Sequence, residues 1–155
     1  MVSAMIRLHE LLSEELVNLD LKEGNKFQVI EDLLELTVQA GRISDRQTAL
    51  DDLLERERYL STGFENGLAV PHAKTKAVSE IVLAFGLSKD GVEFDSLDGK
   101  PTHFIFLLLS PMDTGGPHIQ TLALIARNFQ KPETIERLHQ VDTHEDLLEV
   151  FKEFA

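Results

Sequence analysis

Two apolar stretches decide the fold of this chain: Ile81–Leu87, with the sequence IVLAFGL, and His103–Leu109, with the sequence HFIFLLL. A continuous apolar stretch is typical of a strand buried on both faces of its sheet, and such a sheet needs helices above and below it. Two Asp-Gly pairs, Asp90-Gly91 and Asp98-Gly99, predict turns on either side of the alternating segment Val92–Phe94. These turns indicate that part of the sheet is antiparallel.

The chain before this central region has the spacing of helices. Leucines recur at helical intervals near its start, at positions 8, 11, 12 and 16. Asn25 is expected to cap a second helix that ends at Gly41, where a left-handed residue is favoured. Ser44, with Gln47 three residues later, has the pattern of a capping box. This box predicts a third helix that continues to about Arg58.

The chain after the second apolar stretch returns to helical spacing. An apolar face recurs from Ile119 to Phe129, directly after the break Gly115-Gly116-Pro117. Pro132 is expected to begin a shorter helical turn, and Thr143 to begin the last helix. We therefore predict an α/β fold, a three-layer α/β/α sandwich whose mixed sheet is flanked by helices on both faces. No repeat or linker divides residues 1–155, so a single domain is expected.

The composition narrows the classes of function. The chain has no cysteine, which excludes thiol catalysis, cysteine-based zinc sites and disulfides, and fits a reducing compartment. Its formal net charge of −12 repels nucleic-acid phosphates and anionic lipids, so neither nucleic acid nor membrane is an expected partner. No stretch approaches the ~18 apolar residues of a membrane helix. The first residues also lack the apolar core of a signal peptide, so we expect a cytoplasmic protein.

Histidine is the only side chain here that titrates near neutral pH without special help. His72 directly follows the apolar segment Leu68–Val70 and Pro71. Because proline cannot continue a sheet ladder, the strand is expected to end there, and His72 to project from the strand end, where α/β sheets bind ligands. The alternative interpretation is a surface histidine in a turn.

His118 is the second histidine in an informative context, because it opens the expected helix at residues 119–129. The free backbone N–H groups at a helix N-terminus attract anions, which makes His118 a candidate contact for an anionic group. The alternative is a helix-terminal histidine that only makes a local hydrogen bond. The spacing in sequence does not establish whether His72 and His118 touch.

The segment that ends at His72 resembles the active-site signature of the type 2 enzyme IIA domains. These domains belong to the bacterial phosphoenolpyruvate-dependent sugar phosphotransferase system, in its fructose, mannitol and nitrogen-regulatory branch. The matching residues are Glu57, Phe64, Leu68, Ala69, Val70, Pro71, His72 and Ala73. Glu65 departs from the signature, which has Gly or Ala there, and this raises a question about the local backbone because glutamate rarely adopts a positive φ. The segments Asp90–Pro101 and His118–Leu122 also resemble the family, so the resemblance spans nearly the whole chain.

This resemblance implies a histidine phosphocarrier. His72 would accept a phosphoryl group on Nε2 from HPr or its nitrogen-branch variant, and a pKa of about 6.5 leaves that nitrogen largely unprotonated at cytoplasmic pH. His118 corresponds to the second active-site histidine and would stabilise the phosphoryl group, while Arg56 would add positive charge. Transfer between two histidines requires no metal and no other cofactor. Because HPr must dock over His72, Phe64 and Leu68 are expected to be partly exposed.

Two uses of such a carrier remain open, and a third interpretation belongs to another class. In a regulatory protein, phosphorylation adds about −1.5 to −2 charges and changes binding to a target protein. In a stand-alone sugar-transport component, the phosphoryl group passes to a IIB domain for fructose- or mannitol-type uptake. The absence of a fused IIB domain favours the regulatory use. A zinc site built from His72, His103 and His118 is the third interpretation, although no tight ligand spacing supports it.

Overall fold

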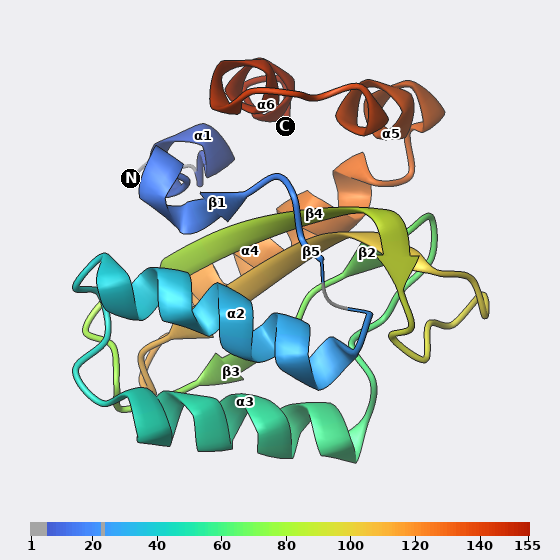
Figure 1. Cartoon of the computed structure of the whole chain (residues 1–155). Helices are drawn as coiled ribbons and strands as arrows, with labels where there is room; N and C mark the ends of the chain where they lie inside the picture. Colours follow the sequence, from blue (N-terminus) through green and yellow to red (C-terminus); the bar gives the residue numbers. More distant parts are fainter. Residues whose placement is uncertain (1–5, 23) are drawn as a thin grey trace.

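The computed structural model describes residues 6–22 and 24–155, and it has a mixed sheet between two layers of helices (Figure 1). The strands are β1 Val17–Asn18, β2 Leu68–Ala69, β3 His72–Lys74, β4 Val82–Val92 and β5 Thr102–Ser110. The α-helices are α1 Leu8–Leu11, α2 Lys26–Gln39, α3 Arg46–Tyr59, α4 Gly116–Asn128, α5 Pro132–His139 and α6 His144–Phe151. A short 3-10 helix, Glu14–Leu16, precedes β1.

The two apolar stretches form the centre of the sheet. The strand order is β1-β4-β5-β2, and β3 also pairs with β5. β4 and β5 are antiparallel, whereas β1 pairs with β4, and β2 and β3 pair with β5, in the parallel sense. The predicted α/β fold with a mixed sheet is therefore confirmed.

The central strands are buried on both faces, as their continuous apolar sequences predict. Successive side chains of a strand point to opposite sides of the sheet. In β5, Ile105, Leu107 and Leu109 join the core cluster beneath α2 and α3. Phe104, Phe106 and Leu108 join the second cluster, which contains side chains of α1, α4, α5 and α6. Figure 1 shows α2 and α3 on one side of the sheet and α1, α5 and α6 on the other.

Two of the predicted helix caps are confirmed, and one is wrong. The Asn25 side chain accepts hydrogen bonds at the start of α2, and the Thr143 side chain does so at the start of α6. The predicted capping box at Ser44 does not form, because the Asp45 carboxylate accepts from the Thr48 N–H at 3.2 Å and caps α3 instead. The Ser44 hydroxyl donates to the carbonyl of Ala77 at 3.0 Å. It fastens the segment before α3 to the loop before β4.

The two Asp-Gly pairs have different structures. Asp98-Gly99 forms the predicted turn, in which the Gly99 N–H donates to the Ser96 carbonyl at 3.0 Å. Asp90-Gly91 forms no chain reversal and lies inside β4, so this turn prediction is wrong. The pairing of β4 with β5 shifts register between Leu87 and Val92, and Gly91 has a φ of +92°. A bulge therefore absorbs the glycine and the strand continues.

The leucines near the start of the chain lie in two short turns. α1 ends at Leu11, and the 3-10 helix begins at Glu14, so the helical spacing continues across a break. Leu8, Leu12 and Leu16 are all fully buried. In the part of the chain that the structure describes, no helix combines the length and the apolar character needed to cross a membrane.

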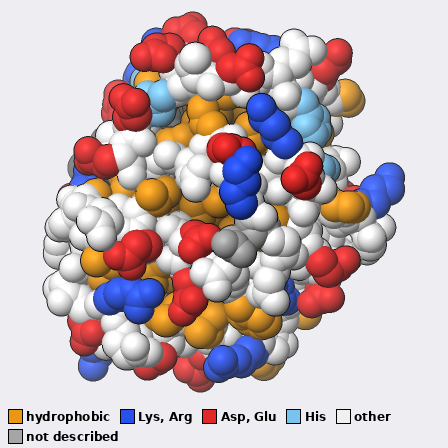
Figure 2. Space-filling model, in the orientation of Figure 1, with side chains coloured by type: hydrophobic (Ala, Val, Ile, Leu, Met, Phe, Trp, Pro, Cys, Tyr) orange, Lys and Arg blue, Asp and Glu red, His pale blue; other side chains and the backbone are white. Residues whose placement is uncertain are grey.

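The acidic excess is dispersed over the visible surface. Figure 2 shows acidic side chains spread across this face, with basic side chains between them and small hydrophobic areas exposed. This face carries no continuous basic patch of the kind that nucleic-acid phosphates require.

Candidate active site

The fold brings His72 and His118 together, although 45 residues lie between them in the printed sequence. Their ring centroids are 5.7 Å apart, and the ring planes are tilted by 56°. His72 opens β3 and pairs with Leu108 near the end of β5. His118 lies in the first turn of α4, which starts shortly after β5 ends. The end of β5 therefore places both imidazoles at one edge of the molecule.

The orientation of His72 follows from a break in the strand before it. β2 and β3 both pair with β5, with Leu68 opposite Phe104 and His72 opposite Leu108. Between them, the Val70 N–H turns away from β5 and donates to the Thr62 carbonyl at 3.2 Å. The predicted end of the strand at Pro71 is thus confirmed, and His72 begins the next strand.

One hydrogen bond distinguishes the two nitrogens of His72. Its Nδ1 lies 2.7 Å from the Val70 carbonyl oxygen. A carbonyl only accepts hydrogen bonds, so Nδ1 carries the proton and Nε2 is unprotonated in the neutral ring. The pKa of His72 is lowered, mainly by desolvation and also by the charge of Arg56. The hydrogen bond to Val70 and the charge of Glu57 oppose this lowering in part. His72 is therefore neutral near pH 7, with a free Nε2.

His118 is buried, with 7% of its surface exposed. The Ser110 hydroxyl lies 2.6 Å from its Nδ1. Desolvation lowers the pKa of His118, and the charges of His72 and Lys74 lower it further. Both site histidines are consequently held in the neutral state at neutral pH.

Arg56, the third predicted site residue, lies in the last turn of α3 and lines the same groove. Its Nη1 donates to the Leu60 carbonyl at 2.6 Å, so the guanidinium is held at the rim by the backbone. The groove is open and carries charges of both signs. Its lining residues are Asp52, Glu55, Arg56, Arg58, Tyr59, His72, Ala73, Lys74 and His118.

An apolar cavity of about 370 Å³ lies beside the groove, and His72 and Arg56 line both. Its apolar lining comes from Leu60, Phe64, Leu68, Val70, Leu97, Leu122 and Ala126. Phe64 is half-buried, as predicted for a docking residue. The prediction for Leu68 is wrong, because Leu68 is only 1% exposed and packs in the core with Phe104.

Other apolar side chains around the site are exposed instead. Tyr59 is 87% exposed, Leu97 77%, Ile119 64% and Leu60 62%. Tyr59 lines the groove, Leu60 and Leu97 line the cavity, and Ile119 follows His118 in α4. The sequence pattern does not single out Leu60, Leu97 or Ile119, because they lie at helix ends and in a turn.

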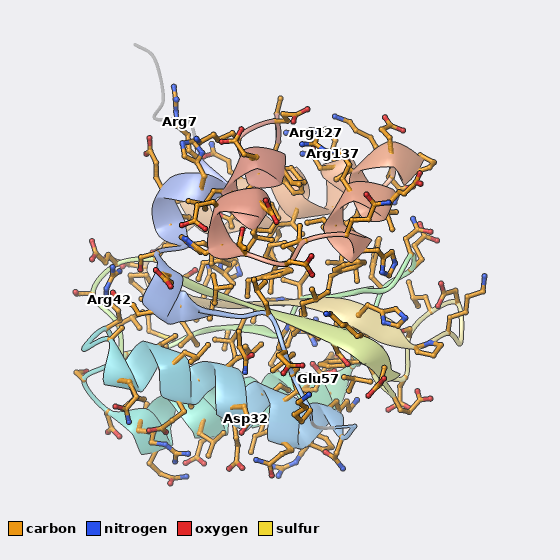
Figure 3. The ribbon with its side chains drawn as sticks, turned by 45° about the horizontal axis from the view of Figure 1, so that its top comes forward. Arg7, Asp32, Arg42, Glu57, Arg127 and Arg137 are labelled. Atoms are coloured by element: carbon orange, nitrogen blue, oxygen red, sulfur yellow. The ribbon has the colours of Figure 1, made fainter. Side chains whose placement is uncertain are left out.

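A buried carboxylate fixes the loop between α3 and β2. The Glu57 side chain is fully buried and accepts from the Thr62 N–H at 2.8 Å and from the Thr62 hydroxyl. Lys26 at the start of α2 pairs with Glu57 at 3.4 Å and with Asp95 at 3.0 Å. In Figure 3, Glu57 lies between the sheet and the N-terminal end of α2.

Glu65 fits the loop without strain, which answers the question raised by its departure from the signature. The left-handed backbone positions of this segment are Asn66, with a φ of +62°, and Gly67, with a φ of +78°. Glu65 itself accepts a hydrogen bond from the Leu68 N–H through its carbonyl, at 3.2 Å. The position that signature members fill with Gly or Ala therefore accepts a glutamate here.

The structure does not bring His103 to the other two histidines. His103 packs against His139, with ring centroids 5.3 Å apart, and its Nδ1 contacts the Ser88 carbonyl at 2.8 Å. Within residues 6–22 and 24–155, no three His, Asp or Glu side chains are arranged to hold a metal ion. The zinc interpretation thus loses its third ligand.

Two partners of the site histidines were missed from the sequence. One is the Val70 carbonyl, which belongs to a backbone and carries no residue-type signal. The other is Ser110, the polar residue that ends the second apolar stretch just before Pro111. A single polar residue at the end of a buried strand is the signal that could have pointed to it.

Comparisons with known proteins agree with this fold. The family model described as "Phosphoenolpyruvate-dependent sugar phosphotransferase system, EIIA 2" matches residues 10–154. A fructose-specific EIIA component of Haloferax volcanii is 40% identical over 139 residues, 90% of each chain. The crystal structure of nitrogen regulatory protein IIA-Ntr from Neisseria meningitidis has a TM-score of 0.82 at 29% identity, covering 93% of this chain and 98% of that one. Enzyme IIA-mannitol of Escherichia coli, solved in complex with phosphorylated enzyme IIB-mannitol, shares the fold with a TM-score of 0.78 at 21% identity, covering 91% and 98%.

Proposed function

Because this chain belongs to the EIIA type 2 family of the phosphoenolpyruvate-dependent sugar phosphotransferase system, we propose that it is a phosphocarrier with His72 as phosphoryl acceptor. The observation that carries this proposal is the hydrogen bond from His72 Nδ1 to the Val70 carbonyl. It leaves an unprotonated Nε2 on a ring that lines an open groove, next to a second imidazole.

The transfer exchanges one nitrogen–phosphorus bond for another. The lone pair of His72 Nε2 attacks the phosphorus of a phosphohistidine on an HPr-like donor. The bond between phosphorus and the donor nitrogen breaks, and its electron pair returns to the donor ring. Nδ1 of His72 keeps its proton and its hydrogen bond to Val70, which stabilises the positive charge of the phosphorylated ring.

Stabilisation of the phosphoryl oxygens is the main task left to the protein, because phosphoryl transfer passes through a loose transition state with dispersed negative charge. His118 would donate an N–H from the first turn of α4, where the free backbone amides add positive potential. Arg56 would contribute its guanidinium from the opposite wall of the groove. Neither contribution needs a metal ion or another cofactor.

The donor would dock on the exposed apolar side chains around His72. Tyr59, Leu60, Leu97 and Ile119 are all more than 60% exposed. Burial of such side chains is the usual source of binding energy at a protein interface. An HPr-like carrier is therefore the partner we propose for this surface, in the cytoplasm.

We propose a regulatory use of the phosphorylated chain, in which the added charge changes binding to a target protein. Its support is the similarity over nearly the whole chain to a nitrogen regulatory protein. Relay to a IIB domain is the second candidate. The fructose-specific relative at 40% identity favours it, as does the complex of the mannitol protein with phosphorylated IIB.

The phosphocarrier proposal is tested by mixing the chain with phosphoenolpyruvate, enzyme I and HPr and measuring its intact mass. We expect the mass to increase by one phosphoryl group, and His72→Gln to abolish the increase. The matched control is His9→Gln, which removes a histidine outside the groove and should leave the increase intact. No increase in the folded wild type, or an increase that persists in His72→Gln, would overturn the proposal.

The downstream use is decided by offering the phosphorylated chain a IIB domain from a fructose or mannitol system. Loss of the phosphoryl group to IIB within the assay time indicates relay. A phosphoryl group that is retained in the presence of each IIB domain supports the regulatory use.

A further inference from the structure

Ser110 carries a buried hydroxyl at the end of β5 that hydrogen-bonds to one of the site histidines. The residue is fully buried, and its Oγ lies 2.6 Å from Nδ1 of His118. Its carbonyl accepts from the Thr75 N–H at 2.8 Å, so the backbone holds the residue in place. The bond to His118 is the only hydrogen bond of this hydroxyl within the described part of the chain.

The burial of Ser110 decides which atom donates. A serine hydroxyl has one proton to donate. If Oγ accepted a proton from Nδ1–H, its own proton would be buried without an acceptor, which is costly. If the hydroxyl donates to Nδ1, both atoms are satisfied. Nδ1 of His118 is then unprotonated, and in the neutral ring the proton sits on Nε2.

His72 is held in the opposite form. The Val70 carbonyl keeps the proton on Nδ1 of His72, and the Ser110 hydroxyl keeps it off Nδ1 of His118. The two rings, 5.7 Å apart, therefore present a free Nε2 on the acceptor and an Nε2–H on its neighbour. A phosphoryl group bound to the first would meet a hydrogen-bond donor on the second.

We propose that Ser110 is a positioning residue that holds His118 as the Nε2–H tautomer and so aims an N–H at the phosphoryl group on His72. This inference rests on the proposed phosphocarrier function for its consequence, although the tautomer itself is a property of the unphosphorylated chain. The titratable groups whose charges act on His118 are His72 and Lys74, both in β3. The far wall of the groove adds Asp52, Glu55, Arg56 and Arg58 from α3.

The tautomer is measured directly by NMR of the unphosphorylated chain labelled with ¹⁵N-histidine. In the wild type we expect Nδ1 of His118 to have the shift of an unprotonated ring nitrogen and Nε2 that of a protonated one. In Ser110→Ala both shifts should move toward each other as the two tautomers mix. A wild-type His118 protonated on Nδ1 overturns the proposal, whatever the outcome of the phosphorylation assay.

The titration of His118 gives a second readout, because its direction depends on which atom donates. A hydroxyl that donates to Nδ1 opposes protonation of that nitrogen, so Ser110→Ala should raise the pKa of His118. A hydroxyl that accepts from Nδ1–H stabilises the charged ring, and its removal would lower the pKa. Ser88→Ala is the matched control, since Ser88 is also buried, at 2% exposed, and its hydroxyl accepts from the Gly91 N–H. It should leave the pKa of His118 unchanged.

The consequence for transfer is measured as the rate of phosphorylation of His72 by phosphorylated HPr. We expect Ser110→Ala to slow the rate by about two- to tenfold, the effect of one weakened hydrogen bond. Ser110→Thr, which restores the hydroxyl, should recover most of the rate. In the His118→Gln background Ser110→Ala should cause no further loss. A further loss there would show that Ser110 acts independently of His118 and would overturn the proposal.

Discussion

At the scale of single residues, the site depends on which nitrogen of each imidazole is free. His72 donates from Nδ1 to a backbone carbonyl, and His118 lies against a buried hydroxyl. Burial lowers the pKa of both rings, so each is neutral near pH 7. A neutral acceptor with a free Nε2 is the state that phosphoryl transfer requires.

We expect His118→Gln to slow phosphorylation of His72 by about 10²–10³-fold, the usual cost of losing one preorganised donor. The phosphoryl group should still appear on His72, because the nucleophile is intact. Rapid-quench measurements with phosphorylated HPr check this rate. An unchanged rate would mean that His118 does not contact the transferred group.

The lowered pKa values of His72 and His118 also predict a pH dependence of stability. Each folded-state pKa lies below the ordinary value of 6.5, so between the two values the unfolded chain binds more protons. The free energy of unfolding should therefore rise with pH up to about 6.5 and then level off. Urea unfolding below and above this value measures the slope. The double variant His72→Gln, His118→Gln should reduce it and leave the part that comes from His139, whose pKa burial also lowers. A slope that is unchanged in the double variant would contradict this assignment.

The sequence predicts the candidate site residues at this scale, but not their hydrogen-bond partners. The signature of residue types names His72, and the wider resemblance to the family names His118 and Arg56. The structure places all three around one groove. Ser110 and the Val70 carbonyl could not be identified in this way, because their contacts depend on how α4 follows β5 and how the chain turns at Val70. Leu68 was misassigned because an apolar residue near the site has the same pattern whether it faces a partner or the core.

At the scale of elements, the site depends on the loop between α3 and β2, which a buried carboxylate holds in place. Residues 60–67 connect α3 to β2, and residues 60–64 of this loop line the apolar cavity beside His72. Glu57 holds Thr62 in this loop, and Lys26 connects Glu57 to Asp95 in the segment after β4. Three segments that are distant in sequence are thus joined by one buried carboxylate.

We expect Glu57→Ala to lower the free energy of unfolding by about 3 kcal/mol, because it leaves the Lys26 ammonium and the Thr62 N–H without their buried partner. Urea denaturation measures this change. Glu55→Ala, two residues before Glu57 and on the exposed side of α3, is the control and should change the stability by less than about 0.5 kcal/mol. An equal effect of the two substitutions would show that the buried pair does not stabilise the loop.

The elements themselves were largely predictable, and their exceptions have local causes. The two apolar stretches form β4 and β5, and the clusters on the two faces of the sheet bury their side chains. The cap of α3 was misplaced by one residue because a carboxylate at Asp45 competes with the hydroxyl of Ser44. The pair Asp90-Gly91 predicts a turn but forms a bulge, because a glycine with positive φ occurs both in tight turns and in β-bulges.

At the scale of the whole molecule, two apolar clusters on opposite faces of one sheet hold the site between them. Arg56 belongs to α3, which packs on one face of the sheet. His118 belongs to α4, which packs on the other face. His72 stands on the sheet itself, where these two layers meet. The three-layer arrangement was predicted, whereas the meeting of three distant segments at one edge is a property of the tertiary fold alone.

NMR of the phosphorylated, ¹⁵N-histidine-labelled chain identifies the nitrogen that carries the phosphoryl group, which we propose is Nε2 of His72. We predict that the phosphorus couples to Nε2 of His72 while Nδ1 stays protonated against the Val70 carbonyl. Coupling to Nδ1 of His72, or to a nitrogen of any other histidine, would show that Nε2 of His72 is not the phosphoryl acceptor.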